Sequence, residues 1–200
     1  MPLSTFFHDN IEYVIPTIFK ATRLDWAHDL ISDGIIYFTN IKQFIDDPHC
    51  ERGDVNEGTH VSARNGSRCT TRFSSLPVYI WCCTLDSQPC RILQTWEDKD
   101  CVIQILNAVE FARRILAAIG QQHPSLWPLQ LGPVTYTKTT GGYEHTDWTD
   151  YIFQKDSRYD DQKEFRFALI GKTGEAGEEH IALKIGSCSD IIRLALVINP

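Results

Sequence analysis

Glu164 is the residue whose type and position best suit it for chemistry. It stands where a charged segment, residues 159–164, runs directly into an apolar segment, residues 165–170, whose only charged residue is Arg166. Aromatic and branched residues in such a run predict a strand that becomes buried on both faces. A rigid strand can present a reactive carboxylate at this junction, because the side chain still reaches a cleft. The alternative is that Glu164 and Arg166 are edge-strand charges that keep a sheet soluble.

A second segment, residues 46–59, is also rich in functional groups. It contains Arg52 and the glycines Gly53 and Gly58. Glycine lets the backbone approach a ligand closely, and the planar guanidinium of arginine suits phosphate or carboxylate. The alternative is a solvated turn. We expect this loop and residues 141–164 to line one cleft.

The order of the elements that position these residues predicts an α+β fold. We expect a single domain over residues 1–200, with a mixed or mostly antiparallel sheet, one long helix and several short ones. Apolar spacing and Gly34 predict a helix over 22–34, and a stripe that ends at Gly120 predicts the longest helix over 98–120. The expected strands are 35–39, 78–84, 134–138, 165–170, 180–185 and 191–198.

Composition limits the classes of function. The chain has 200 residues and a net charge of −7, so no general basic field favours nucleic acid. Only residues 61–75 are locally basic, and we interpret them as a solvated connection rather than a site for a polyanion. The seven cysteines form no CxxC pair, and no HExxH motif is present, so we expect no metal site.

The same features predict a cytoplasmic protein. Residues 1–9 lack the basic and apolar regions of a signal peptide, and no apolar run is long enough to span a membrane. Cysteines without a secretion signal are typical of reduced thiols in the cytosol. We therefore expect no membrane partner, while the oligomeric state is open.

Several short motifs resemble a bacterial and phage family, the domain of unknown function 2971. They are Gly34–Asn40 with Asp47-Pro48, Gln162–Arg166, and the closing segment from Lys184 to Ile198. The resemblance covers most of the chain. It implies no assigned activity.

A second resemblance, to ADP-ribosyltransferases, is carried by Gln162-Lys163-Glu164. Those enzymes use a Gln-x-Glu pair on a loop that enters a strand. The glutamate stabilises the oxocarbenium-like ribose of NAD as nicotinamide leaves, and the amide orients the acceptor. The resemblance implies that Glu164 and Gln162 are catalytic, that NAD is the substrate, and that the acceptor is a protein, a nucleic acid or, in a glycohydrolase, water.

The same resemblance suggests which residues hold NAD. Arg52 is the candidate for the arginine that binds the phosphates, and Thr39 or Ser74-Ser75 for the hydroxyls that brace the glutamate. Tyr37, Asn40 and Arg166 complete the expected cofactor-binding set. Such an enzyme would act as a toxin or an anti-defence factor.

The competing hypothesis is a non-catalytic binding protein of a phage or bacterium. It would sequester a nucleotide or inhibit a host protein with the same loop and Arg166, without turnover. The two hypotheses separate at Glu164, because Glu164→Gln should abolish turnover in an enzyme and change only affinity in a binding protein.

Overall fold

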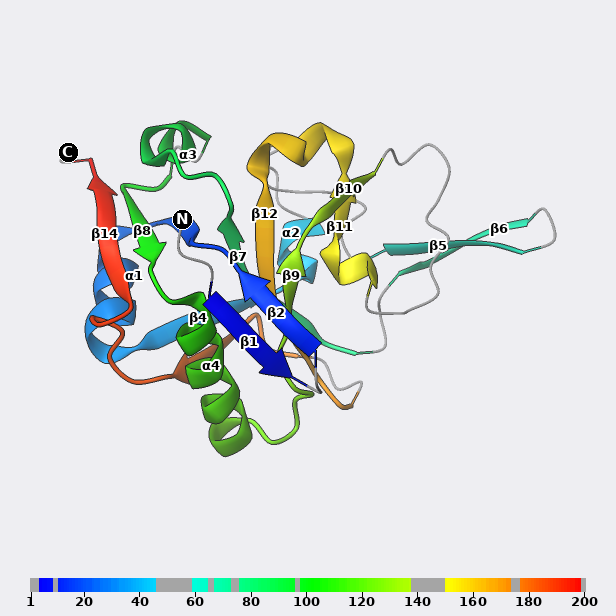
Figure 1. Cartoon of the computed structure of the whole chain (residues 1–200). Coiled ribbons are helices and arrows are strands. Elements are labelled where there is room, and N and C mark those ends of the chain that lie inside the picture. The colour runs from blue at the N-terminus through cyan, green and yellow to red at the C-terminus, as the bar shows by residue number, and fades with distance from the viewer. Residues whose placement is uncertain are drawn as a thin grey trace. The chain divides into compact units, whose positions relative to one another are not determined.

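The computed structural model describes residues 4–8, 11–45, 59–64, 67–72, 76–95, 98–137, 150–173 and 177–198 (Figure 1). Contacts divide the chain into two compact units, each assembled from separate segments. The first unit is Met1–Tyr37, Cys82–Pro124 and Ala182–Pro200, and the second is Phe38–Trp81 and Ser125–Ile181. Three strands, β4 (Ile35–Asn40), β7 (Val78–Thr84) and β13 (His180–Lys184), begin in one unit and end in the other. The expectation of one domain stays a prediction.

Antiparallel strands form the framework of the first unit. Strand β3 (Ile18–Thr22) pairs with β8 (Cys101–Ile105), and β8 pairs on its other side with β14 (Ile192–Val197). The hairpin β1 (Ser4–His8) and β2 (Ile11–Ile15) is also antiparallel. Short helix α3 (Pro89–Thr95) supplies two apolar side chains to a core on one face of β3 and β8; this core consists of Phe19, Ile92, Leu93 and Val102.

The first helix ends where the sequence predicts. Helix α1 (Leu24–His28) continues into a π-helical turn, Asp29–Asp33, and Gly34 closes it in the left-handed conformation with φ of 67°. A Cβ at Gly34 would overlap the backbone of Gly186, so only glycine fits this turn without strain. Strand β4 follows at once.

The longest helix is shorter than expected. Residues 98–120 were predicted as one helix, but the first part of that range forms β8, and α4 spans Ala108–Gln122. Cys101–Ile105 contains branched residues that are buried on both faces of a central strand, and their spacing imitated a helical stripe. Asn107 begins α4, because its side chain accepts a hydrogen bond from the backbone N–H of Glu110 at 3.0 Å.

The second unit is also mostly antiparallel. Strand β12 (Glu164–Ile170) lies between β7 and β9 (Gln130–Pro133), and the pairing with β9 is antiparallel. Strand β10 (Thr135–Thr137) pairs in parallel with β11 (Gln154–Asp156), which is followed by a 3-10 helix over Ser157–Gln162. The remaining elements are α2 (Lys42–Ile45), the hairpin β5 (Thr59–Arg64) and β6 (Ser67–Arg72), and a 3-10 helix over Asp150–Phe153.

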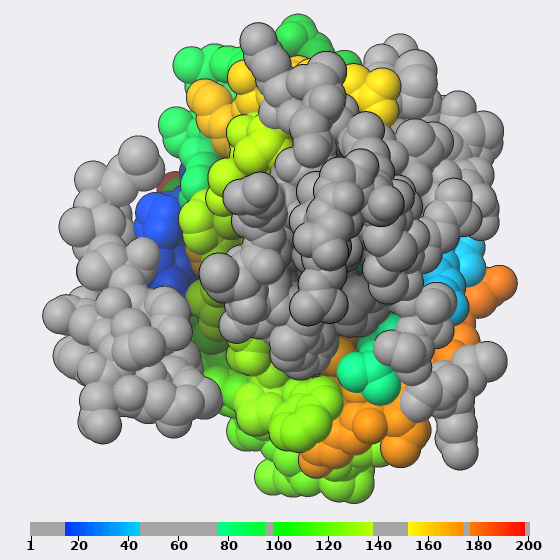
Figure 2. All heavy atoms as spheres, turned by 90° about the vertical axis from the view of Figure 1, so that its right-hand side faces the viewer, coloured from blue at the N-terminus to red at the C-terminus, as the bar shows by residue number. Residues whose placement is uncertain are grey.

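Aromatic packing fixes β12 in the core of the second unit. Phe167 makes edge-to-face contacts with Trp81 and Phe165, with ring centroids 5.7 and 5.5 Å away. All seven residues of β12 are buried. Figure 2 shows another face of the molecule, with the segment that contains β9 and β10 in yellow-green.

The elements confirm the expected fold class. The structure has an α+β fold with mostly antiparallel strands, one long helix and several short ones. Among the helices in the described ranges, none is long and apolar enough to cross a bilayer.

Candidate functional site

Glu164 stands at the first position of β12, directly after a sharp turn. Lys163 has a φ of 44°, which is uncommon for a side chain other than glycine, and it turns the chain from the 3-10 helix into the strand. The backbone N–H of Glu164 donates a 2.7 Å hydrogen bond to the hydroxyl of Tyr136. The start of β12 is thus held in place independently of the Glu164 side chain.

The carboxylate of Glu164 is bonded to two cations. Arg166 Nε lies 2.6 Å from Oε1, and Arg166 Nη2 lies 3.1 Å from Oε2. Residues two apart on a strand point to the same face, which is why this pair forms within one strand. Lys155 Nζ, from β11, lies 3.3 Å from Oε2. Both oxygens of the carboxylate therefore accept charge-assisted hydrogen bonds.

Lys155 links the carboxylate to Gln162. Its ammonium donates to Gln162 Oε1 at 2.9 Å and also lies 4.8 Å from the ring centroid of Tyr159. We call Lys155, Gln162, Glu164 and Arg166 the Glu164 cluster. The structure thus brings together three residues that the sequence nominated, and Lys155 joins them.

The Glu164 cluster lies inside the protein. The exposed fraction is 6% for Glu164, 5% for Lys155 and 1% for Arg166. Arg166 Nη1 also donates to the backbone carbonyl of Ile152 at 2.5 Å. The Glu164 carboxylate is thus enclosed by its neighbours, and the expectation that it faces a cleft stays a prediction. The edge-strand alternative is wrong, because β12 has a neighbouring strand on each side.

This geometry can serve a structural role. The positive charges of Arg166 and Lys155 compensate the negative charge of the buried carboxylate. Stabilising a developing cation requires that charge to face the ligand. The Glu164 cluster can hold three segments together: β11, the 3-10 helix and β12.

The other nominated residues make separate contacts or fall outside the described ranges. Thr39 Oγ1 lies 3.3 Å from His180 Nδ1, and the Asn40 side chain donates to the carbonyl of Glu178 at 3.3 Å. Tyr37 is 43% exposed. Arg52, Ser74-Ser75, the 46–58 part of the first loop and residues 141–149 of the second lie outside the described residues, so the expected cleft stays a prediction.

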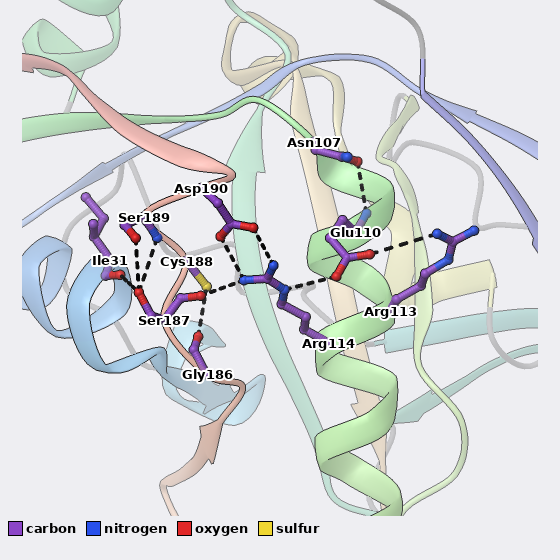
Figure 3. Close-up of polar contacts among 10 residues, drawn as sticks. All are labelled: Ile31, Asn107, Glu110, Arg113, Arg114, Gly186, Ser187, Cys188, Ser189 and Asp190. Carbon is purple, nitrogen blue, oxygen red and sulfur yellow. Dashed lines mark hydrogen bonds and ion pairs between the residues drawn. The ribbon is translucent and has the colours of Figure 1, made fainter.

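A second polar cluster ties the loop before β14 to helix α4 (Figure 3). Arg114 makes two hydrogen bonds to the carboxylate of Asp190, at 3.0 and 2.6 Å, and one to the carbonyl of Ser187 at 2.5 Å. Arg114 also pairs with Glu110 at 3.1 Å, as the i,i+4 spacing predicts. These four hydrogen bonds use most of the N–H donors of the guanidinium and fasten the loop.

The electrostatics of the second cluster agree with that role. The hydrogen bond from Arg114 lowers the pKa of Asp190 below its ordinary value of 3.8. Burial raises the pKa of the Cys188 thiol, and Arg114 opposes this increase. Outside this cluster, on strand β8, burial raises the pKa of the Cys101 thiol to about 12. Both thiols are thus held in the protonated form, which is a poor nucleophile.

Sequence reasoning missed Lys155 and Tyr136. Each is an isolated polar residue without a motif, and neither is close to Glu164 in a way that strand periodicity reveals. Across the part of the chain that the structure describes, no three His, Cys, Asp or Glu side chains are grouped to hold a metal ion.

Comparisons with known proteins add no assignment. No family model, curated protein or solved structure matches this chain. The two resemblances that the motifs suggest therefore stay predictions.

Proposed function

We propose that this chain acts by binding a partner protein, and that Glu164 supports the fold instead of performing turnover. The observation that carries the proposal is the state of the Glu164 carboxylate. Both of its oxygens are bonded to Arg166 and Lys155, and the residue is 6% exposed.

The energetics of the cluster favour this reading over NAD chemistry. Removing one partner from a buried ion pair costs about 3–5 kcal/mol, which sets the scale for drawing Glu164 away from Arg166 and Lys155. A ligand that needed the Glu164 charge would have to supply that energy. A micromolar ligand has only about 8 kcal/mol of binding free energy in total. Rearranging the cluster would therefore consume roughly half of it.

Exposed aromatic and aliphatic side chains support a protein partner. Trp26 and Trp127 are each 47% exposed, and Ile198 is 52% exposed. Tryptophan and tyrosine are enriched in protein interfaces and often dominate their energetics. A cytoplasmic location is part of the proposal, and it is supported by the free thiols among the described residues: Cys82, Cys83, Cys90, Cys101 and Cys188.

One observation favours a second candidate, NAD-dependent ADP-ribosyl transfer or NAD hydrolysis. The amide of Gln162 and the carboxylate of Glu164 converge on the Lys155 ammonium, at 2.9 and 3.3 Å. An amide and a carboxylate held side by side on a Gln-x-Glu segment are what that chemistry requires. In this candidate Glu164 stabilises the oxocarbenium-like ribose, and the acceptor is a protein, a nucleic acid or water.

Nicotinamide release separates the two candidates. Wild-type protein and Glu164→Gln are incubated with NAD, with and without cell lysate as a source of acceptors. Glu110→Gln is the matched control, because it removes another arginine-paired carboxylate from the unit that lacks the Glu164 cluster.

The proposal predicts that all three proteins release nicotinamide only at the rate of the protein-free blank. Release by wild type and Glu110→Gln that Glu164→Gln lacks would overturn it and establish the second candidate. Circular dichroism of each variant shows whether the proteins compared are folded.

A further inference from the structure

Among the strands that the structure describes, β14 is the outermost in the first unit's sheet. Within the described ranges it pairs only with β8, in the register Arg193↔Gln104 and Val197↔Cys101. The register shifts between Leu194 and Leu196, so a β-bulge lies in the middle of the strand. The other edge of β14 carries its own row of backbone groups, as every outermost strand does.

The backbone hydrogen bonds show which groups point outward. The N–H of Ile198 donates to the carbonyl of Asp100 at 2.8 Å, and the carbonyl of Ile191 accepts from Leu106 N–H at 2.8 Å. In an antiparallel strand the N–H and C=O groups of one residue point to the same side, and those of the next residue point to the opposite side. The backbone groups of Leu194 and Val197 therefore point away from β8.

The side chains of β14 give little protection against strand addition. The strand reads Ile-Arg-Leu-Ala-Leu-Val, with Arg193 as its only charge and without proline or lysine. Leu194 is 38% exposed, and Ile198, which follows the strand, is 52% exposed. Soluble proteins commonly protect an outermost strand with several charges, with proline or with a bulge, and β14 has only the bulge.

A hollow of about 500 Å³ adjoins this edge. One row of side chains crosses three strands at its floor, because Phe19 pairs with Gln104 and Gln104 with Arg193. Arg193 Nε donates to Gln104 Oε1 at 2.8 Å, and Ser87 also lines the hollow. A strand added next to β14 would continue the row, with one side chain directly across from Arg193.

We propose that β14 accepts an extended segment of the partner protein as an added antiparallel strand, with an aspartate or glutamate across from Arg193. Main-chain hydrogen bonds to Leu194 and Val197 provide affinity, and the hollow with Arg193 provides selectivity. This inference rests on the proposed protein-binding function and names the surface and the chemistry of its partner.

Charge decides between a partner segment and a second copy of this chain. Strand β14 contains no carboxylate, so a second β14 offers nothing negative to Arg193. An acidic residue in an extended partner segment pairs with it across the strands, whereas a basic residue there is repelled.

The test uses a fluorescein-labelled synthetic peptide of alternating threonine and valine with one central glutamate. Fluorescence anisotropy measures its binding to the full chain. Two further peptides are compared: one has lysine in place of the glutamate, and one has alternate backbone amides N-methylated. We expect the glutamate peptide to bind about tenfold more tightly than the lysine peptide, and the methylated peptide not to bind.

Three variants locate the binding. Val197→Pro should abolish binding and keep the fold, because its N–H points away from β8 and proline is tolerated there. Arg193→Ala should remove the preference for glutamate over lysine. Arg113→Ala, which removes a 60% exposed arginine side chain of helix α4, is the matched control and should bind as wild type does.

Three results would overturn the inference. The first is that the glutamate peptide does not bind. The second is that the lysine and methylated peptides bind as tightly as the glutamate peptide. The third is a concentration-dependent dimer of the chain that Val197→Pro dissociates, while no peptide binds. None of these results contradicts the proposed function, provided that the rate of nicotinamide release equals that of the protein-free blank. Release that depends on Glu164 removes the proposed function whatever the peptides do.

Discussion

Replacing Glu164 with glutamine should destabilise the protein strongly. The substitution keeps the shape of the side chain and removes its charge. The glutamine oxygen can still accept from Arg166 Nε, which lies 2.6 Å from Oε1 in the native protein. The new amide NH₂, however, takes the position of Oε2, which faces donors on Arg166 at 3.1 Å and Lys155 at 3.3 Å. The amide NH₂ of the glutamine then faces the N–H donors of Arg166 and Lys155, and no hydrogen bond forms between them in this buried site.

The expected loss is about 3 kcal/mol, at the lower end of what removing one partner from a buried ion pair costs, because one hydrogen bond survives. For a chain of this size, each kcal/mol lowers the melting temperature by about 2–4 °C. Glu164→Gln should therefore melt roughly 6–12 °C below wild type.

Thermal unfolding followed by circular dichroism measures this shift, with Glu110→Gln as control. The Glu110 side chain is 35% exposed, and its pair with Arg114 is worth about 0.5 kcal/mol, so the control should shift by only about 1–2 °C. Equal shifts in the two variants would refute the reasoning, because the Glu164 cluster would then contribute no more than a surface pair.

Three further substitutions, all in the first unit, have predicted outcomes. Gly34→Ala should lower stability by more than about 2 kcal/mol, because φ is 67° and the new Cβ would overlap the carbonyl of Gly186; Gly120→Ala, in open space on helix α4, should raise it by about 0.5–1 kcal/mol. Urea denaturation measures both, and a stabilised Gly34→Ala would contradict the prediction. Arg114 lowers the pKa of Asp190 from 3.8, so their pair adds stability above that value, and the addition is lost as pH falls through the lowered pKa. Asp190→Asn should therefore show a smaller drop in melting temperature between about pH 6 and about pH 3 than wild type, and an equal drop would count against the pair.

Local patterns predicted much of the fold, because turn chemistry and apolar periodicity act over a few residues. Gly34 ends the first helix as expected, and β4, β7 and β12 lie where branched and aromatic runs occur. The failure at residues 101–105 is also physical. A buried central strand has no polar face, so its residues match a helical stripe as well as a strand.

The contacts of the candidate site were only partly predictable. The pair of Glu164 and Arg166 follows from strand periodicity, since residues two apart share a face. Lys155 reaches Glu164 because β11 and the 3-10 helix fold back on β12, and no local pattern encodes that return. The pair of Arg114 and Asp190 joins residues 76 positions apart, for which the sequence contains no signal.

The most direct test of the central claim observes the Glu164 carboxylate itself. Protein labelled with ¹³C at glutamate side-chain carboxyls is titrated with NAD, and the Glu164 resonance is assigned by its loss in Glu164→Gln. Because Arg166 and Lys155 hold this carboxylate inside the protein, we expect its chemical shift to stay unchanged at saturating NAD. A change confined to the Glu164 resonance would contradict that expectation and show that the carboxylate meets the nucleotide.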